Sequence, residues 1–436
     1  MDNLAYIKES YDQLAIAEKD SNLQPIRKQA FDSFNKLEIP TSRNEEWKYT
    51  RISSLFNKEF AFPVGSVPVF SAKEFKKFRL PSYENANELV FVNGIFSLEL
   101  SKILSTGLVI MPLEEAAANK FKDFVFANLG HSSNYLKDGI NALNTAFING
   151  GIFIHIEKGK IIEQPIFIYN ITDAQSANVL SQPRSLVHIC ENAQVQIVET
   201  YTTIGKEESF TNQVMEIVVE EAARLEYYKI QNDASHCSQV STTHIRQAGK
   251  SYTYVVTVSL DGNIIRNNLN VVLDAAFCEA HMYGLYFLGG KTHVDNHTVV
   301  DNVKPNCFSD EFYKGIIDDA ATGVFNGKIF VRQPAQKTNA YQSNKNILLS
   351  ETAVVNAKPQ LEIFADDVKC SHGCTVGKLD EEGLFYLQSR GISKKMARAL
   401  LLYSFTADIL EKIKLEPVRN YIDQLISKRL EFINHD

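Results

Sequence analysis

The chain has 436 residues, which is too long for one ordinary hydrophobic core and indicates either several domains or a fold that grows by repetition. Its formal net charge is −7 and it has no dense run of Lys and Arg, so a nucleic-acid backbone is not expected as its main partner. No apolar stretch is long enough to cross a bilayer and the N-terminus lacks the apolar core of a secretory signal, so we expect a cytoplasmic protein.

Residues 1–90 are expected to form a helical N-terminal region. From Met1 to about Phe60, apolar residues recur at spacings of three, four and seven, as a helix with one buried face requires. Trp47, the only tryptophan, lies in "IPTSRNEEWKYT". We interpret it as a packing anchor against a larger body, with a ligand platform as the alternative.

Residues 91–379 are expected to form a β-rich core. Short apolar runs follow one another without clean alternation, as in strands covered on both faces, and no amphipathic helix of ten or more residues separates them. This argues against a doubly wound α/β sheet, whose parallel strands need helical crossovers. The runs include "GIFIHIE", "PIFIYNI", "SLVHICE", "AQVQIVETY", "QVMEIVVE", "YTYVVTVSL" and "PQLEIF".

A recurring mark lies between these runs: an acidic residue followed two positions later by Ala, at separations of 30, 53, 45 and 32 residues. A repeating unit of about 25 to 30 residues, with some copies unmarked, accounts for this spacing. Two strands per unit would build a β-solenoid, whose core lengthens as coils stack. A large β-sandwich or a cupin-like double-stranded β-helix is the alternative. The marks begin at Glu191, Glu221, Asp274, Asp319 and Glu351.

Residues 380–436 are expected to form three helices. Gly391 suits the left-handed end of the first, Ser393 can cap the second, and Pro417 stands at the start of the third. The second helix is apolar over more than one face, which fits either a surface for a partner protein or a buried three-helix core. Its apolar residues are Leu400, Leu401, Tyr403, Phe405 and Ile409.

The stretch "DDVKCSHGCTVGKL" places Cys370, His372 and Cys374 at alternate positions. On a strand such side chains leave the same face about 6.6 Å apart, too far for all three to reach one tetrahedral ion. They can offer one or two ligands to a zinc, copper(I) or iron-sulfur site completed by a second chain. Two buried thiols beside a hydrogen-bonded His is the alternative. A catalytic Cys–His dyad is disfavoured by the same spacing.

A second candidate is the alternating set His293, Asp295 and His297, close in sequence to Asp301 and Cys307. Two imidazoles and a carboxylate suit a non-haem iron or cupin-type metalloenzyme, although strand alternation again spreads them. The structural alternative is that they are polar groups satisfied in the turns of a solenoid. The isolated cysteines Cys190, Cys237, Cys278 and Cys307 are interpreted as small buried hydrophobic residues.

Several catalytic motifs are missing from the sequence. It contains no G-x-x-x-x-G-K-[ST], no G-x-G-x-x-G after a strand, no G-x-S-x-G and no H-E-x-x-H. We therefore expect that the chain neither binds nor hydrolyses a nucleotide by itself.

Three stretches together resemble the SufB/SufD family of iron-sulfur cluster assembly scaffolds. They are "RNEEWKYT", the long run from "HVDNHTVVDNVKPNCFSDEFYKG" to "DDVKCSHGCTVG", and "LFYLQSRGISKKMARALL". The resemblance extends from about Arg43 to Ile413. No cysteine precedes Cys190, whereas SufB proteins usually carry an N-terminal cysteine motif, so the SufD branch is the closer match.

The resemblance implies a right-handed parallel β-helix between N-terminal and C-terminal helical parts. It further implies a non-catalytic scaffold that pairs with SufB through the end of the β-helix and binds the ATPase SufC through its C-terminal helices, with a homodimer as an alternative in isolation. The His of its "C-S-H-G" stretch maps onto His372, with Cys370 as a weaker neighbour and Cys374 in doubt. These residues would contribute to a transient cluster shared with the partner chain, and no tightly bound cofactor is expected.

Overall fold

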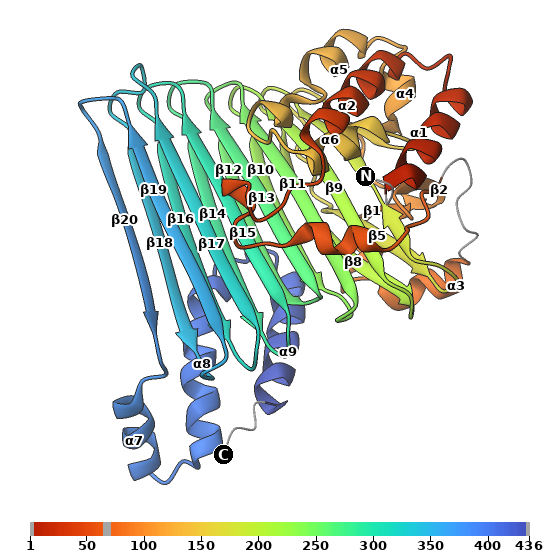
Figure 1. Ribbon diagram of the computed structural model, residues 1–436. Coiled ribbons are helices and arrows are strands. Elements are labelled where there is room, and N and C mark those ends of the chain that lie inside the picture. Colours follow the sequence, from red (N-terminus) through yellow and green to blue (C-terminus); the bar gives the residue numbers. More distant parts are fainter. Residues whose placement is uncertain (1–3, 64–70, 433–436) are drawn as a thin grey trace.

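The computed structural model describes residues 4–63 and 71–432, and its main body is a β-solenoid of about eight turns made from two long sheets (Figure 1). Strands make up 42% of the chain and helices 26%, which places the protein in the mainly β class, as predicted. One sheet contains β2 (Ile95–Lys102), β1 (Asn87–Val92), β5 (Ile166–Ala174), β8 (Gln194–Gly205), β10 (Arg224–Asn232), β12 (Tyr252–Asp261), β14 (Glu279–Leu288), β16 (Phe308–Ile317), β18 (Asn339–Leu348) and β20 (Lys369–Gly377). We call this sheet B.

The opposite sheet, sheet A, supplies the second strand of each coil. It contains β3 (Leu108–Pro112), β4 (Ile152–Ile156), β7 (Arg184–Ile189), β9 (Ser209–Val219), β11 (Cys237–Gln247), β13 (Ile264–Leu273), β15 (His293–Asn302), β17 (Thr322–Val331) and β19 (Val354–Ile363), with the short β6 (Val179–Ser181) beside β9. Apart from β3 on β4 and β1 on β2, the strands pair in parallel.

The coils have nearly constant length. Equivalent positions at the start of successive sheet B strands are 27 to 31 residues apart, so each coil stacks on the last without a change of face. These paired positions are Gln194, Arg224, Tyr252, Glu279, Phe308, Asn339 and Lys369.

The predicted acidic-x-Ala marks lie at the corners of the coils. Asn192 and Ala222 adopt a positive φ there, and the Ala that follows each is fully buried beneath the corner. A small side chain at this point leaves room for the neighbouring coil. The marks at Glu191, Glu221 and Asp274 lie on the edge where sheet A passes into sheet B, whereas Asp319 and Glu351 lie on the opposite edge. The uneven spacing of the marks therefore reflects two edges.

Near-continuous apolar runs arise because the strands are buried on both faces. Inward side chains such as Val255 of β12 and Val271 of β13 meet inside the coils, while outward ones such as Val256 contact the covering helices. Part of the interior is polar: the Lys229 ammonium lies inside and donates to Ser241 Oγ at 2.8 Å and Thr243 Oγ1 at 3.0 Å.

The N-terminal segments as far as Phe62 cover the outer face of sheet A, where their apolar side chains pack with Leu180, Phe210 and Val240 of the sheet (Figure 1). Residues 1–3 of the predicted helical stretch lie outside the described residues. The helices on sheet A are α1 (Ala5–Ala17), α2 (Gln24–Leu37), η2 (Glu45–Trp47) and η3 (Ile52–Asn57). The short helices α3 (Ala72–Phe75), η4 (Lys76–Phe78) and η5 (Tyr83–Asn85) pack instead on the outer face of sheet B.

A further group of short helices lies between β3 and β4, inside the stretch expected to be β-rich. It comprises α4 (Leu113–Ala116), α5 (Lys122–Asn128), η6 (His131–Asn134) and α6 (Gly139–Ala146). Each has at most eight residues, little more than two turns, which is too short for a helical period to stand out in the sequence. These helices pack on the outer face of sheet A around Phe153 and Leu186 and beside α2.

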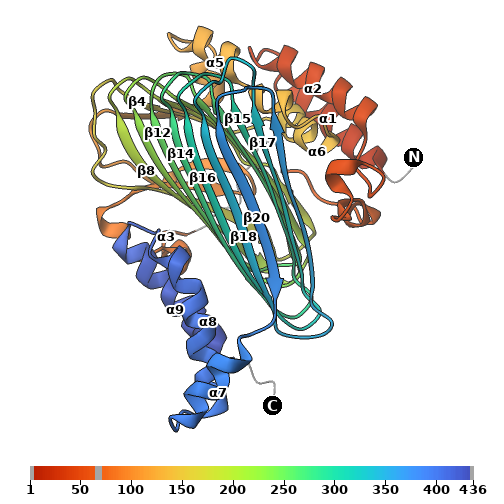
Figure 2. The same cartoon turned by 90° about the vertical axis from the view of Figure 1, so that its left-hand side faces the viewer.

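The C-terminal helices α7 (Glu381–Ser389), α8 (Lys394–Leu410) and α9 (Glu416–Phe432) follow β20, and α8 and α9 cover the outer face of sheet B (Figure 2). Gly391 has φ +86°, and the Ser393 side chain accepts a hydrogen bond from the backbone of Met396, which confirms the predicted stop and cap. In the part of the chain that the structure describes, α7 buries none of its side chains, and no helix has the length and apolarity needed to cross a bilayer.

Candidate functional site

Cys370, His372 and Cys374 lie on β20, the last strand of sheet B (Figure 2). Within the described residues β20 hydrogen-bonds only to β18, and His372 is in register with Gln342. Paired residues of parallel strands point to the same face, and Gln342 points into the solenoid. The three side chains therefore continue the interior rows of the coils to the open end of the β-helix.

Their exposure follows from this terminal position. His372 and Cys374 are exposed, and Cys370 is half-buried against the end of the apolar core. Partial burial raises the pKa of both thiols above the ordinary value. Neither cysteine is therefore a preformed thiolate, and a metal ion or a cationic neighbour would have to stabilise its deprotonated form.

The row that ends at His372 is polar over its last three positions. Glu311, Gln342 and His372 occupy successive coils in register, and Gln342 Nε2 donates to Glu311 Oε2 at 2.7 Å. Burial raises the pKa of Glu311 to about 7. The titratable Glu311 carboxyl inside the solenoid is thus hydrogen-bonded to Gln342, the residue directly next to His372 on the neighbouring strand.

Within the described residues, the second candidate set does not bring its ligand atoms together around one point. Asp295 Oδ2 accepts hydrogen bonds from Arg266 Nη1 at 2.8 Å and Thr50 Oγ1 at 2.6 Å, and His293 Nε2 lies 2.9 Å from the same hydroxyl. His297 Nε2 is 2.7 Å from a carboxylate oxygen of Glu46. Strand alternation spreads the three side chains, and each binds the N-terminal segment instead of a common ion. We call this arrangement the N-terminal clamp.

Trp47 belongs to the same clamp. Its ring is 2% exposed, it lies 3.9 Å from the centre of the Arg266 guanidinium, and its Nε1 donates to Asp138 Oδ2 at 3.2 Å. The predicted role as a packing anchor is confirmed. Asp301, in contrast, accepts from Arg332 Nε at 2.8 Å and from the Tyr135 hydroxyl at 2.9 Å.

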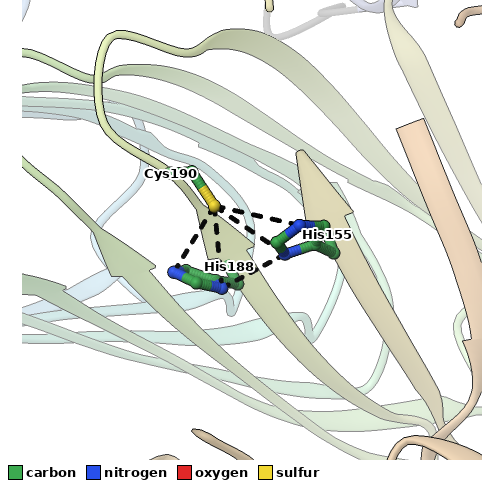
Figure 3. Close-up of side chains that lie close together, drawn as sticks. All are labelled: His155, His188 and Cys190. Atoms are coloured by element: carbon green, nitrogen blue, oxygen red, sulfur yellow. Dashed lines mark hydrogen bonds between the residues drawn. The ribbon is translucent and has the colours of Figure 1, made fainter. Parts of the chain in front are cut away.

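Cys237, Cys278 and Cys307 are buried, as predicted for small hydrophobic residues, and Cys190 is buried too but contacts two imidazoles (Figure 3). His155 of β4 is in register with His188 of β7, and their Nδ1 atoms are 3.2 Å apart. Cys190 Sγ is 3.8 Å from each of these atoms. Within the described residues, these three form the only group of at least three His, Cys, Asp or Glu side chains close enough to share an ion.

Sequence reasoning missed this cluster because its members belong to different coils. The signal present was "HIC" at 188–190, which puts a His and a Cys on one strand face, with a further His 33 residues earlier, close to one coil length. Without the register, the coil length alone could not pair His155 with His188. Burial lowers the pKa of His155 to about 4 and raises that of Cys190 to about 11, so the group is neutral at pH 7.

Two protein-family models match consecutive parts of the chain and together cover most of it. Residues 170–405 match the family described as "SUF system FeS cluster assembly, SufBD core domain", and residues 4–168 match the "SufBD protein N-terminal region". The chain belongs to the SufBD family. The SufBD core match begins within β5 and ends within α8, so it includes β20 with His372.

Relatives of this SufBD protein align over nearly the whole chain. The iron-sulfur cluster assembly SufBD family protein slr0076 of Synechocystis is 33% identical over 94% of this chain and 92% of its own. The iron-sulfur cluster assembly protein SufD of Escherichia coli is 26% identical over 93% of each, and SufD of Bacillus subtilis is 24% identical over 94% of each. The predicted resemblance is confirmed, and it assigns the chain a role in iron-sulfur cluster assembly.

Proposed function

We propose that this SufBD protein is the SufD-like, non-catalytic scaffold subunit of a cytoplasmic SUF complex. It pairs with a SufB-type subunit through the last coil of the β-helix, binds the SufC-type ATPase through its C-terminal helices, and supplies His372 to a nascent cluster that both scaffold subunits share. Cys370 is a secondary ligand. The nascent cluster is cargo and leaves the complex.

The observation that carries the proposal is the placement of His372 at an exposed coil end. Within the described residues, β19 and β20 are each paired on one side only, so both terminal strands present unpaired backbone groups. Side chains there are also apolar and exposed, which suits a protein interface. They include Tyr341, Val354, Ile363, Phe364 and Val376.

A partner strand on this edge would lie about 4.8 Å from β20, the ordinary spacing of paired strands. A ligand from its facing position could then share an ion with His372, which the spacing within β20 prevents for Cys370 and Cys374. This supports a site assembled from two chains. A second copy of this chain fits the same edge, so a homodimer in isolation competes with the heterodimer.

The ATPase contact is supported by an exposed apolar surface on α7 and the start of α8. Phe385 is 73% exposed, and Tyr386, Met396, Leu400 and Tyr403 are exposed beside it. The opposite side of α8 is buried on sheet B through Leu402 and Ile409, so α8 can transmit a displacement to the strands beneath it. We propose that ATP-driven pairing of two ATPase subunits moves these helices and opens the shared coil end to iron and sulfur.

The test is co-purification of the full-length chain with its SufB-type and SufC-type partners. The Leu400→Glu variant should lose the ATPase and retain the scaffold partner, because a charge on an apolar contact is desolvated at a cost. Ile16→Glu, on a more exposed apolar residue of α1, is the control and should retain both. Undiminished ATPase capture by the Leu400→Glu variant would place the contact elsewhere.

A further inference from the structure

We infer that His155, His188 and Cys190 bind a divalent transition-metal ion of the zinc type at the outer face of sheet A. This site is separate from the coil end that carries His372. It rests on the geometry of the three side chains and does not depend on the proposed function.

The backbone holds the three ligand groups on one face. His155 and His188 are paired neighbours on adjacent parallel strands, and Cys190 follows His188 by two positions, just past the end of β7. Cross-strand neighbours lie closer together than alternate residues of one strand. For this reason the cluster converges, whereas Cys370, His372 and Cys374 on a single strand do not.

The donor atoms have the spacing of a coordination sphere. Two nitrogens bound to zinc at tetrahedral angles lie about 3.3 Å apart, and a nitrogen and a sulfur lie about 3.6 Å apart. The observed separations are 3.2 Å between the two Nδ1 atoms and 3.8 Å from each to Cys190 Sγ. Cys190 Sγ is nearly equidistant from both nitrogens of each ring, at 3.7 to 3.9 Å, and so lies over the imidazole faces. Each imidazole therefore has to turn to direct a nitrogen lone pair at an ion held by the thiolate. An ion bound by these three groups would leave a fourth position for water or another ligand.

Glu220 orients one ligand for this role. Its Oε1 accepts a hydrogen bond from His188 Nε2 at 2.7 Å, so the neutral imidazole carries its proton on Nε2 and directs the lone pair of Nδ1 at His155. A carboxylate behind a ligating His is the usual second partner of zinc sites. The proton now held between the two Nδ1 atoms belongs to His155 and would move to its Nε2 when a cation binds, while the Cys190 thiol would release its proton to solvent.

Two phenylalanine rings pack against the imidazoles of the cluster. Phe124 of α5 stacks on His188 with ring centres 3.8 Å apart, and Phe121 lies 4.7 Å from His155. These rings restrict the imidazoles and exclude water, which strengthens the attraction between a cation and a thiolate. Two imidazoles and one thiolate favour zinc over magnesium or calcium, which prefer oxygen ligands. Ferrous iron is the main competitor for such a donor set.

The experiment titrates Zn²⁺ into chelator-treated full-length protein against a competing indicator, and repeats the titration with Co²⁺. We expect one site that loses at least about 100-fold in affinity in Cys190→Ser and about 10- to 100-fold in Glu220→Gln. Wild-type protein should show a Co²⁺–thiolate charge-transfer band that is missing in Cys190→Ser. Cys237→Ser, a buried cysteine without imidazole neighbours, and His372→Ala are the matched controls and should keep both signals.

Misfolding is an unsuitable explanation for a loss of affinity in Glu220→Gln, because the Glu220 side chain is half-exposed and the substitution keeps its shape. Tighter binding of Fe²⁺ than of Zn²⁺ in an anaerobic titration, lost in the same variants, would overturn the zinc assignment. Equal Zn²⁺ affinity in wild type, Cys190→Ser and Glu220→Gln would overturn the site itself.

Discussion

The N-terminal clamp gives the sharpest stability prediction. Asp295 is almost fully buried, and its carboxylate neutralises the Arg266 guanidinium, which has no side-chain exposure. Asp295→Ala leaves that cation buried without its partner, a change that typically costs about 3–5 kcal/mol. Thr50→Val removes only the hydroxyl that donates to the same carboxylate, so we expect a smaller loss of about 1–3 kcal/mol.

These free energies translate into modest shifts of the melting temperature because the chain is long. An unfolding entropy of roughly 2.1 cal/mol/K per residue amounts to about 0.9 kcal/mol/K for 436 residues. Asp295→Ala should therefore lower Tm by about 3–6 °C, and Thr50→Val by about 1–3 °C.

The fluorescence of Trp47 is a direct probe of the N-terminal clamp, because Trp47 is the only tryptophan and its ring stacks on Arg266. Its fluorescence should shift to the red and lose intensity cooperatively at a lower temperature in Asp295→Ala. Asp32→Ala, an exposed carboxylate on α2, is the control and should leave both readouts unchanged. An unchanged Tm and emission in Asp295→Ala would refute the clamp. A bound metal ion that disappears with Asp295 would restore the metalloenzyme interpretation.

Two further predictions concern the interior row and the coil end. Glu311 has a pKa raised to about 7 from 4.5, so its carboxyl destabilises the fold progressively between about pH 4.5 and 7, and this loss is complete above about pH 7. Glu311→Gln should therefore be more stable than wild type at pH 9 by up to about 3 kcal/mol. Equal stability at pH 9, measured by urea unfolding, would refute burial of a charged carboxylate. Val376→Asp should abolish pairing with the SufB-type partner, measured by gel filtration. Leu98→Asp, on the exposed β2 edge at the other end of sheet B, is the control and should leave the pairing intact. The reverse result would place the interface at the β2 end of the sheet.

The solenoid could be predicted because its physical requirements repeat. Every coil needs strands buried on both faces and a small residue beneath each corner, and both leave a mark in the sequence, as at Ala193 and Ala223. The alternation of Cys370, His372 and Cys374 also indicates that these three side chains of one strand cannot all bind the same ion. These inferences depend only on neighbours within a strand or on one coil length.

The features that could not be predicted from the sequence depend on contacts between segments that are far apart in the chain. The pairing of His155 with His188 requires the register between coils, and the clamp joins Asp295 to Thr50, 245 residues apart. Nothing local distinguishes Asp295 as a partner of Arg266 from Asp295 as a metal ligand, since both roles need a carboxylate on a strand face. Cys190 was interpreted as inert for the same reason: its burial is visible in the sequence, but its two imidazole neighbours are not.

The most direct test of the central claim is anaerobic cluster reconstitution on the complete scaffold complex containing His372→Ala. We expect normal assembly with both partners and a loss of the iron-sulfur absorption, while Ser371→Ala, one position away on the opposite face of β20, keeps it. A His372→Ala complex that builds the cluster at the wild-type rate and yield would contradict the assignment of this imidazole to the shared site.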